Sequence, residues 1–336
     1  MVVNVTRGSL VESVHAIAAC AVDARGQTVL AIGDVDVPVF VRSAAKPFIA
    51  AEIVASGAAD RFGFTDEHLA VIAASHNAEP LHVERVREVL ARIGLPESAL
   101  QCGVHPPAYD PAAADLAASG ELPSAIHNNC SGKHAGILAM CVHLGFEPAT
   151  YLEPDHPAQR RILAFCARMV DEDPAQLPIG VDGCGIPVFA TPLRSAARAF
   201  ARLATLEGLD AADAWSLERV RAAMAAQPYY VAGTGRLDTA LMEATSGRIV
   251  CKAGAEGVHG DALRREGLGL AVKVVDGARR AAAPAVIAIL RELGALEPGE
   301  RNRLEEFATP NVRNVAGRIV GRIAAARETI AVGGAS

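Results

Sequence analysis

Two serines and two lysines lie in patterns that could activate a hydroxyl group. Ser43-Ala44-Ala45-Lys46 is an S-x-x-K motif, and on the first turn of a helix its spacing places the hydroxyl and the amine on one face. Ser75-His76-Asn77 and Lys252-Ala253-Gly254 follow later in the chain as S-x-N and K-x-G motifs. Because a neutral lysine can accept the proton of a neighbouring serine, the set predicts nucleophilic catalysis.

Each of these motifs also has an interpretation without catalysis. Ser43 could cap a helix whose Lys46 is solvated. Ser75 could lie in an ordinary polar turn, and Lys252 could be a surface charge at the end of a strand. The motif order agrees with that of serine β-lactamases and penicillin-binding proteins. The spacing does not agree, since only 32 residues separate Ser43 from Ser75, and Ala253 replaces a hydroxyl residue. We therefore treat the agreement as an analogy of fold.

Lysine is scarce in this chain, so each lysine is a candidate for a specific role. Of the 32 basic residues, 28 are arginine, and the lysines are Lys46, Lys133, Lys252 and Lys273. Arginine stays protonated, whereas a lysine in a dry site can serve as a base, a nucleophile or a ligand. Codon bias and chance are the alternative explanation of the same count.

A second group of residues has the chemistry of a metal site. Cys130 and His134 form a C-x₃-H pattern, and Asp182 and Cys184 form D-x-C. Zinc accepts thiolate, imidazole and carboxylate ligands, but this combination is not an established finger spacing. The alternative is a set of buried, inert thiols. The remaining cysteines have apolar or helical contexts and are expected to be packing residues: Cys20, Cys102, Cys141, Cys166 and Cys251.

The composition restricts the class of protein. With 336 residues, of which 51% are hydrophobic and 21% charged, the chain is expected to be globular rather than disordered or a coiled coil. The net charge of −6 and an aromatic content of 4% argue against a nucleic-acid-binding surface. Seven cysteines, an odd number, suit reduced thiols or metal ligands better than a disulfide framework.

The pattern of a membrane span or of an export signal is missing. The longest apolar run, residues 281–290, is interrupted by Pro284 and is far shorter than the roughly 20 residues that cross a bilayer. Residues 1–10 lack a basic segment followed by an apolar core and a cleavage site. We therefore expect a cytoplasmic protein with a small-molecule substrate and no membrane partner.

The apolar pattern places the two serines at opposite ends of helices. A helix over 45–55, with Pro47 tolerated in its first turn, puts Ser43 and Lys46 at its start. A short buried helix over 66–74 ends at Ser75, which then lies in a connecting segment.

Further elements alternate along the chain without an internal repeat or a linker. The closely spaced prolines of residues 105–111 predict a loop. We expect one α/β domain over residues 1–332, which could have two lobes, and a frayed tail over 333–336. The pattern predicts a hairpin over 14–22 and 28–32, strands over 39–41, 248–252 and 269–275, and helices over 80–93, 134–143, 157–170, 192–204, 211–225 and 282–293.

Taken together, several longer strings resemble the rhizobial-type, or class 3, L-asparaginases. The resemblance spans nearly the whole chain, and the strings are ordered and jointly specific. They are Arg42-Ser43-Ala44-Ala45-Lys46-Pro47, Ala74-Ser75-His76, Asn129-Cys130-Ser131-Gly132-Lys133-His134, Asp155-His156-Pro157, Asp182-Gly183-Cys184 and Lys252-Ala253-Gly254-Ala255-Glu256.

The resemblance implies a fold, an activity and a catalytic set. The fold would be akin to that of serine β-lactamases and glutaminases, with a mixed, largely antiparallel sheet flanked by helices. The protein would be a homodimer that hydrolyses L-asparagine to L-aspartate and ammonia. Ser43 with Lys46, and Ser75 with Lys252, look like the family's two serine–lysine tandems around one pocket.

The resemblance also implies a metal site, and its neighbours are candidates for substrate binding. Cys130, Lys133 and Cys184 look like the family's zinc ligands, with Asp182 beside the site and a water completing the shell. Such a zinc would support substrate binding or loop structure and need not be essential for turnover. Arg42 adjoins the expected nucleophile, and we expect it to pair with the α-carboxylate of the substrate, because a guanidinium matches a carboxylate in two hydrogen bonds. Asp182, beside the metal site, is also assigned to substrate binding. The alternative for Arg42 is a surface arginine.

Other functions remain open from the sequence. A related glutaminase or a penicillin-type serine hydrolase would share the fold and the serine chemistry. A non-catalytic, zinc-bound binding protein would share the thiols. Asn77 and Ala78 replace the small hydroxyl or glycine residues that the resemblance leads us to expect before Glu79, a difference that bears on the choice between asparagine and glutamine.

Overall fold

A long strand joins the two parts of the main sheet in the computed structural model, which describes residues 1–326. The first half of β2 (Leu10–Asp23) pairs with β1 (Val2–Arg7), and its second half pairs with β9 (Leu268–Val274). The strand order is β10-β11-β1-β2-β9-β8-β7, β3 adds to β2, and every pair is antiparallel. The other strands are β3 (Thr28–Ile32), β7 (Ile249–Ala253), β8 (Val258–Leu263), β10 (Asn311–Arg313) and β11 (Ile319–Ala326).

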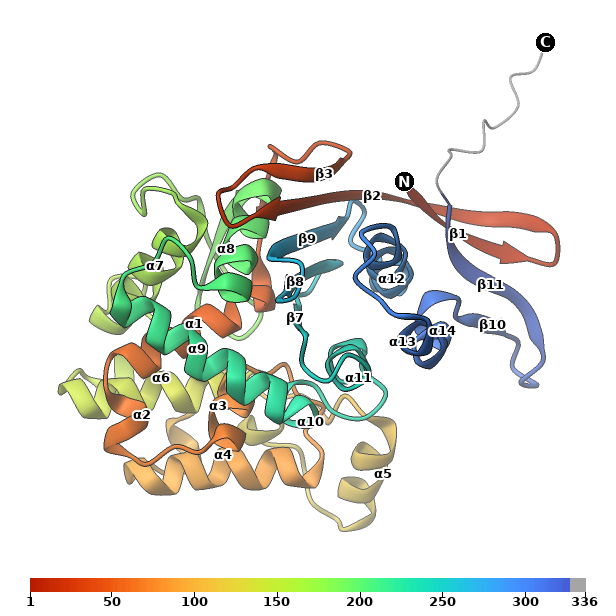
Figure 1. Ribbon diagram of the computed structural model, residues 1–336. Helices are drawn as coiled ribbons and strands as arrows, with labels where there is room; N and C mark the ends of the chain where they lie inside the picture. Colours follow the sequence, from red (N-terminus) through yellow and green to blue (C-terminus); the bar gives the residue numbers. More distant parts are fainter. Residues whose placement is uncertain (327–336) are drawn as a thin grey trace.

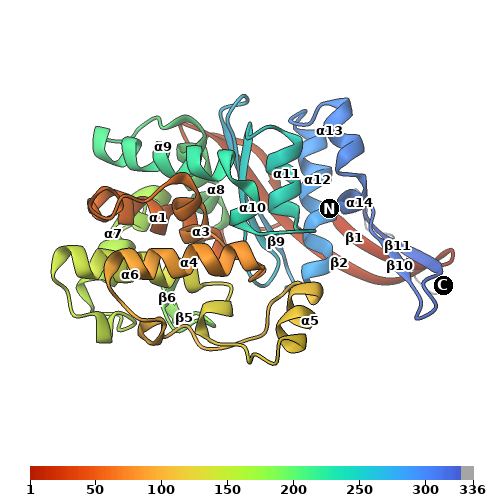
Figure 2. The same cartoon turned by 90° about the horizontal axis from the view of Figure 1, so that it is seen from below.

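Helices lie on both sides of this sheet (Figure 1). Helix α8 (Leu193–Thr205) packs against β2, β8 and β9, and α12 (Ala282–Glu292) lies on the other side against β1, β8, β9 and β11. The predicted α/β class with a largely antiparallel sheet flanked by helices is therefore confirmed. Beyond α8 lies a region made of helices, which is also visible in Figure 2. Its helices are α1 (Lys46–Ala55), α3 (Asp66–Ile72), α4 (Pro80–Ile93), α6 (Ser131–Leu144), α7 (Pro157–Val170) and α9 (Ala211–Ala226).

The remaining elements are short. A three-stranded antiparallel sheet has the order β4-β6-β5. Its strands are β4 (Pro38–Phe40), β5 (Ile179–Val181) and β6 (Pro187–Pro192). The short helices are the 3₁₀ turn η1 (Arg42–Ala45), α2 (Ala58–Arg61), α5 (Asp110–Ala118), α10 (Pro228–Val231), α11 (Leu237–Ala244), α13 (Pro298–Arg303) and α14 (Glu305–Ala308).

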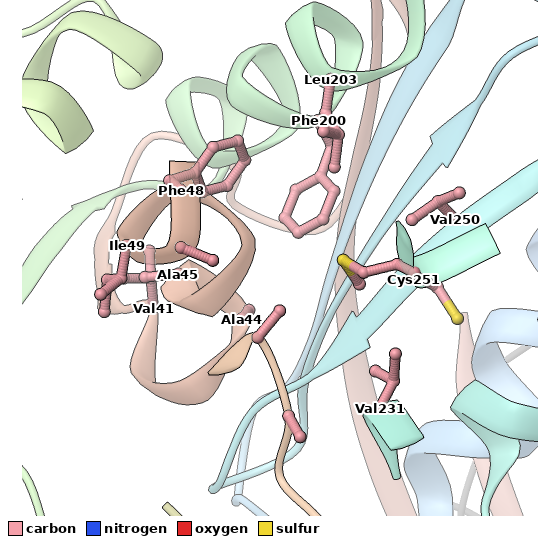
Figure 3. Packing of buried hydrophobic residues seen from close by; sticks show 14 of the residues in the cluster. Val41, Ala44, Ala45, Phe48, Ile49, Phe200, Leu203, Val231, Val250 and Cys251 are labelled. Carbon is pink, nitrogen blue, oxygen red and sulfur yellow. The ribbon is translucent and has the colours of Figure 1, made fainter. Parts of the chain in front are cut away.

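An aromatic contact fixes helix α1 against the sheet side of the molecule. The rings of Phe48 on α1 and Phe200 on α8 meet edge to face, with centroids 5.4 Å apart (Figure 3). A methyl group at Gly260 of β8 would overlap the ring of Phe200, so glycine leaves the room that this ring occupies. Edge-to-face pairs contribute stabilisation beyond the apolar area they bury. The contact therefore holds in place the start of α1, where Lys46 lies directly after the turn that carries Ser43.

Glycine also permits a close approach at the start of α6. A Cβ atom at Gly132 would overlap the backbone carbonyl of Val71 on α3. Any other residue would push the two helices apart, because the obstacle is backbone and cannot rotate away. The first turn of α6 carries Lys133 and follows Cys130, so Gly132 sets the depth at which both enter the core.

The structure corrects two local predictions. Ser43 lies in η1, one 3₁₀ turn before α1 begins at Lys46, rather than in the first α-helical turn. The predicted loop over 105–111 ends two residues earlier, because Asp110 and Pro111 open α5, and proline is tolerated in a first helical turn. The predicted tail over 333–336 lies outside the described residues. Among residues 1–326, every helix is too short or too polar to cross a membrane.

Candidate active site

The two serines of the predicted catalytic set face one cavity of about 480 Å³. Ser43 reaches it from η1, and Ser75 from the segment that follows α3. Ser43 also borders a neighbouring cavity of about 70 Å³, whose wall includes Lys46, Lys133 and Asp182. The fold therefore brings the predicted serines together from segments that are 32 residues apart.

Lys46 is buried beside these serines, so it is not the solvated lysine of the alternative interpretation. Its exposed fraction is 1%, and its Nζ donates to Ser75 Oγ at 3.0 Å, to the Asn129 carbonyl at 3.4 Å and to the Ala74 carbonyl. Burial lowers the pKa of Lys46, and the charge of Lys133 lowers it further, while Cys130 raises it. Burial dominates, so the pKa of Lys46 lies below its ordinary value. The serine hydrogen-bonded to Lys46 is thus Ser75, which belongs to the other predicted tandem.

Ser75 lies in a buried connection rather than in a surface turn. Residues 74–79 are all buried. The Ser75 amide donates to the Val231 carbonyl at 3.0 Å, and the Asn77 amide donates to the Ala232 carbonyl at 3.0 Å. These bonds tie the main chain of the segment to α10 and its C-terminal end.

Lys252 is fully buried and paired with a carboxylate. Its Nζ lies 3.5 Å from Asp238 Oδ2 and donates to the Ala253 carbonyl at 2.7 Å. Burial lowers the pKa of Lys252, Asp238 raises it, and Lys46 lowers it, with a net value of about 8. A strand-end surface charge would not show this burial, so that alternative is wrong for Lys252.

Sequence patterns did not predict the charged network that surrounds Lys252. Asp238 Oδ1 lies 3.2 Å from His259 Nε2, and His259 Nδ1 lies 3.1 Å from Asp261 Oδ2, with all three side chains buried. Burial alone would lower the pKa of His259, but the two carboxylates raise it well above the ordinary value. Burial would raise the pKa of Asp238, but Lys252 and His259 outweigh it and hold the pKa far below its usual range. A clue in the sequence was the spacing of His259 and Asp261, which puts both on one face of β8.

Asp238, Cys251 and His259 also have the composition of a metal site. Within residues 1–326 their ligand atoms lie within 4.8 Å of one another. However, His259 directs both ring nitrogens at carboxylates, and the amine of Lys252 lies beside Asp238. Protons and the lysine charge thus already neutralise these carboxylates, and we interpret the cluster as a hydrogen-bonded network.

The predicted zinc ligands do converge. Cys130 precedes the first turn of α6, Lys133 lies in that turn, and Cys184 comes from the loop between β5 and β6. All three side chains are buried, and Lys133 Nζ donates to Cys184 Sγ at 2.9 Å. We refer to Cys130, Lys133 and Cys184 as the thiol–amine cluster.

The thiol–amine cluster places a thiolate beside an ammonium. Burial lowers the pKa of Lys133, but Cys130 and Cys184 raise it above its ordinary value, so this amine must lose its proton to bind a metal. A hydrogen bond with Cys184 lowers the pKa of Cys130 well below its usual range, burial opposes this, and Lys133 lowers it further. The same hydrogen bond and burial raise the pKa of Cys184. Two sulfur atoms and one amine nitrogen in contact are a donor set that zinc accepts, with a fourth position left for another ligand. The residues present therefore fit the predicted metal.

Arg42 and Asp182 form an ion pair at the edge of this site. Arg42 Nη2 lies 2.8 Å from Asp182 Oδ1, and Arg42 Nε donates to the same oxygen at 2.9 Å. The backbone φ of Arg42 is +50°, a left-handed conformation that costs roughly 1–3 kcal/mol in a residue other than glycine. Burial would raise the pKa of Asp182, but Lys133, the Gly183 amide and Arg42 lower it. The charge of Arg42 is thus already balanced within the protein.

The other predicted residues lie apart from the chemistry. Lys273 is only partly buried, and its Nζ donates to the Glu256 carbonyl at 2.7 Å and to the Val274 carbonyl. Cys20, Cys141 and Cys166 are buried, unpaired thiols, and burial raises the pKa of each. They therefore have the environment of packing residues.

Comparison with solved structures finds distant matches. One is a crystal structure described as "putative beta-lactamase from Bacteroides dorei DSM 17855", with 16% identity and a TM-score of 0.40, covering 76% of this chain and 84% of that one. Another is described as "Crystal Structure Analysis of Mglu", with 15% identity and a TM-score of 0.37, covering 83% of this chain and 67% of that one. Comparison with curated protein sequences finds no match.

The sequence also matches the model of a protein family over nearly its whole length. The model described as L-asparaginase II matches residues 3–325, which include every residue of the cavity wall and of the thiol–amine cluster. This match confirms the resemblance carried by the serine and lysine motifs. The chain belongs to the L-asparaginase II family.

Proposed function

We propose that this protein is an L-asparaginase, an amidohydrolase that converts L-asparagine to L-aspartate and ammonia by a serine–lysine mechanism. The observation that carries the proposal is the hydrogen bond of 3.0 Å from buried Lys46 to Ser75, on the wall of a cavity that Ser43 shares. The family match supports amide hydrolysis as the reaction class. A buried amine in contact with a hydroxyl supplies the means of moving a proton that an unactivated amide requires.

The residues divide the proton transfers between them. Ser43 Oγ attacks the side-chain amide carbon of asparagine, and its proton passes to neutral Lys46. The tetrahedral intermediate collapses as the amide nitrogen takes a proton through Ser75, supplied by Lys252, and leaves as ammonia. Water then attacks the resulting ester and passes a proton through Ser75 to Lys252, which restores its charge. Aspartate departs as Lys46 returns its proton to Ser43. Asp238 and its hydrogen-bonded partner His259 hold Lys252 at the position from which it donates.

The thiol–amine cluster is proposed to hold zinc through Cys130, Lys133 and Cys184. When bound, zinc would supply positive charge beside the substrate pocket and tie the loop that carries Cys184 to α6. Asp182 and Arg42 line the small cavity next to the cluster and would orient the substrate. No proton transfer in the proposed reaction depends on the metal.

Removing zinc should weaken substrate binding more than turnover. We expect Cys184→Ala to lose stoichiometric zinc and to raise KM for asparagine about tenfold, with a smaller change in kcat, because the ligand and its neighbours position substrate. Metal analysis by mass spectrometry and steady-state kinetics measure the two effects. Cys141→Ala, a buried thiol outside the cluster, is the control and should keep its zinc. A zinc-free wild-type protein would contradict this assignment.

The pH dependence should report on Lys252. Its pKa of about 8 is the balance of burial, which lowers it, Asp238, which raises it, and Lys46 and Arg236, which lower it. As the proposed donor it must be protonated, so kcat/KM should fall as the pH rises through 8, by about tenfold per pH unit. Rates between pH 6 and 10 measure this limb. Lys252→Arg holds its proton throughout this range and cannot donate it, so it should lose most of the activity. Substantial activity with an unchanged limb would argue against the assignment.

A substrate panel tests the proposed function itself. Ammonia release should be fastest from L-asparagine, slower from L-glutamine, and hydrolysis of a chromogenic β-lactam should be slowest. Preference for glutamine would favour the glutaminase alternative, and preference for the β-lactam would favour the penicillin-type hydrolase. A zinc-loaded protein that turns over none of the three would support the non-catalytic binding protein.

Two further expectations from the sequence stay proposals. The cytoplasmic location and the homodimer are implied by the sequence and by the resemblance. Sedimentation of the purified chain measures the oligomeric state.

A further inference from the structure

Arg236 is a largely buried cation without a carboxylate partner. It precedes the first residue of α11 and is only partly exposed. Within residues 1–326, every carboxylate oxygen lies beyond 4 Å of its guanidinium nitrogens, in contrast to Arg42, which is paired with Asp182. Burial lowers the pKa of Arg236, the more distant Asp238 raises it, and Arg279 lowers it. A buried guanidinium without a counter-ion is a place where an anion would bind.

The orientation of Arg236 leaves part of its guanidinium free. Nη1 donates to Asn77 Oδ1 at 2.9 Å and to the Ser75 carbonyl at 3.3 Å. Nε and Nη2 have no hydrogen-bond partner among the described residues. Arg236 lines the same cavity as Ser43 and Ser75, so these two donors are available to a molecule in that cavity.

The position also matches the size of the substrate. Nη1 contacts the main-chain carbonyl of Ser75, and Ser43 borders the same cavity as Arg236. In asparagine, two carbon atoms separate the side-chain amide carbon from the α-carboxylate. An anchor for that carboxylate must therefore lie a few ångströms from the serines, which is where Arg236 lies. Arg42 is less suitable, because binding a second carboxylate would compete with Asp182.

We propose that Arg236 binds the α-carboxylate of the substrate and so selects amides of α-amino acids over simple amides. This inference rests on the proposed function and names the residue that recognises the substrate class. The two oxygens of the carboxylate accept from Nε and Nη2, while Nη1 keeps its bonds to Asn77 and Ser75. The carboxylate of the substrate thus supplies the counter-ion that Arg236 lacks within the protein.

The test compares two substrates that differ in the carboxylate alone. Wild-type enzyme should hydrolyse L-asparagine with a kcat/KM at least roughly 100-fold above that for 3-aminopropanamide, which lacks the carboxylate. Arg236→Ala should lose about this factor with L-asparagine and change little with 3-aminopropanamide. Arg236→Lys should recover part of the loss through its charge. An equal fall for both substrates would assign Arg236 a structural role through Asn77 and Ser75 and would overturn the proposal.

A binding measurement separates this inference from the proposed reaction. Calorimetry should show that wild-type protein binds L-aspartate more tightly than β-alanine, and that Arg236→Gln, a milder change, removes the difference. Equal binding by the wild type and Arg236→Gln would contradict the role of Arg236 even in a protein with full activity. Selective binding by a wild-type protein that turns over no asparagine would support Arg236 and contradict the reaction instead.

Discussion

Replacing Ser43 by alanine should lower kcat for L-asparagine by about 10⁴-fold or more, because removal of a nucleophile leaves only the catalysis that binding and charge supply. The hydroxyl of Ser43 borders both the large cavity and the small one beside the thiol–amine cluster. Ser75, by contrast, already accepts a hydrogen bond from Lys46. In the proposed mechanism this bond makes Ser75 the residue that relays protons, and Ser43 makes the attack.

Ammonia release and mass spectrometry of acid-quenched enzyme measure this prediction. The aspartyl ester should be found on the peptide that contains Ser43 in the wild type and in Ser75→Ala. Ser119→Ala is the matched control, since Ser119 is exposed at the end of α5 and should leave the rate unchanged. Recovery of the ester on Ser75, or normal turnover by Ser43→Ala, would show that the nucleophile is misassigned.

Replacing Lys46 should be nearly as damaging with arginine as with methionine, and we expect each variant to lose about 10³-fold or more in kcat. A guanidinium retains the positive charge but cannot accept a proton, whereas methionine fills similar space with neither property. If Lys46 acts as a base, both variants fail for the same reason. If it acts only by its charge, arginine should retain much of the rate.

The Lys46 comparison needs folded variants, because this side chain is almost completely buried. Thermal unfolding of each variant establishes that the fold persists, and Lys46→Met is the variant expected to pack best. Lys273→Arg is the matched control, since Lys273 contacts main-chain carbonyls and lies outside the proposed reaction. Substantial activity in Lys46→Arg alone would overturn the proposed base.

The sequence predicted the helices and the hairpin well where hydrophobic periodicity is strong. Helices α4 and α7 have the predicted ends, because proline opens each and a residue with positive φ follows each. Strand β8 was missed, because it is buried on both faces and includes His259 and Asp261, so it lacks the alternation of apolar and polar residues. Strands β1 and β11 were missed for another reason, since each pairs with a segment near the other end of the chain.

The sequence predicted which residues belong to the site, but it did not predict which of them are hydrogen-bonded to one another. Short motifs identified Ser43, Ser75 and the lysines. The small number of lysines in the chain drew attention to Lys46 and Lys252, which are indeed buried. The bond between Lys46 and Ser75 was not predictable, because it depends on how α1 packs beside the segment after α3. Arg236 and Asp238 carry no motif, and arginine is too common in this chain for one to stand out.

The main chain joins the two halves of the site at a single peptide bond. The Asn129 carbonyl accepts from Lys46, and the next residue, Cys130, enters the thiol–amine cluster. An engineer who replaces Cys130 to change the metal preference of the cluster will therefore also move the acceptor that faces Lys46. Variants at Cys130 should be screened for turnover as well as affinity, whereas Cys184 offers a position that acts on affinity first.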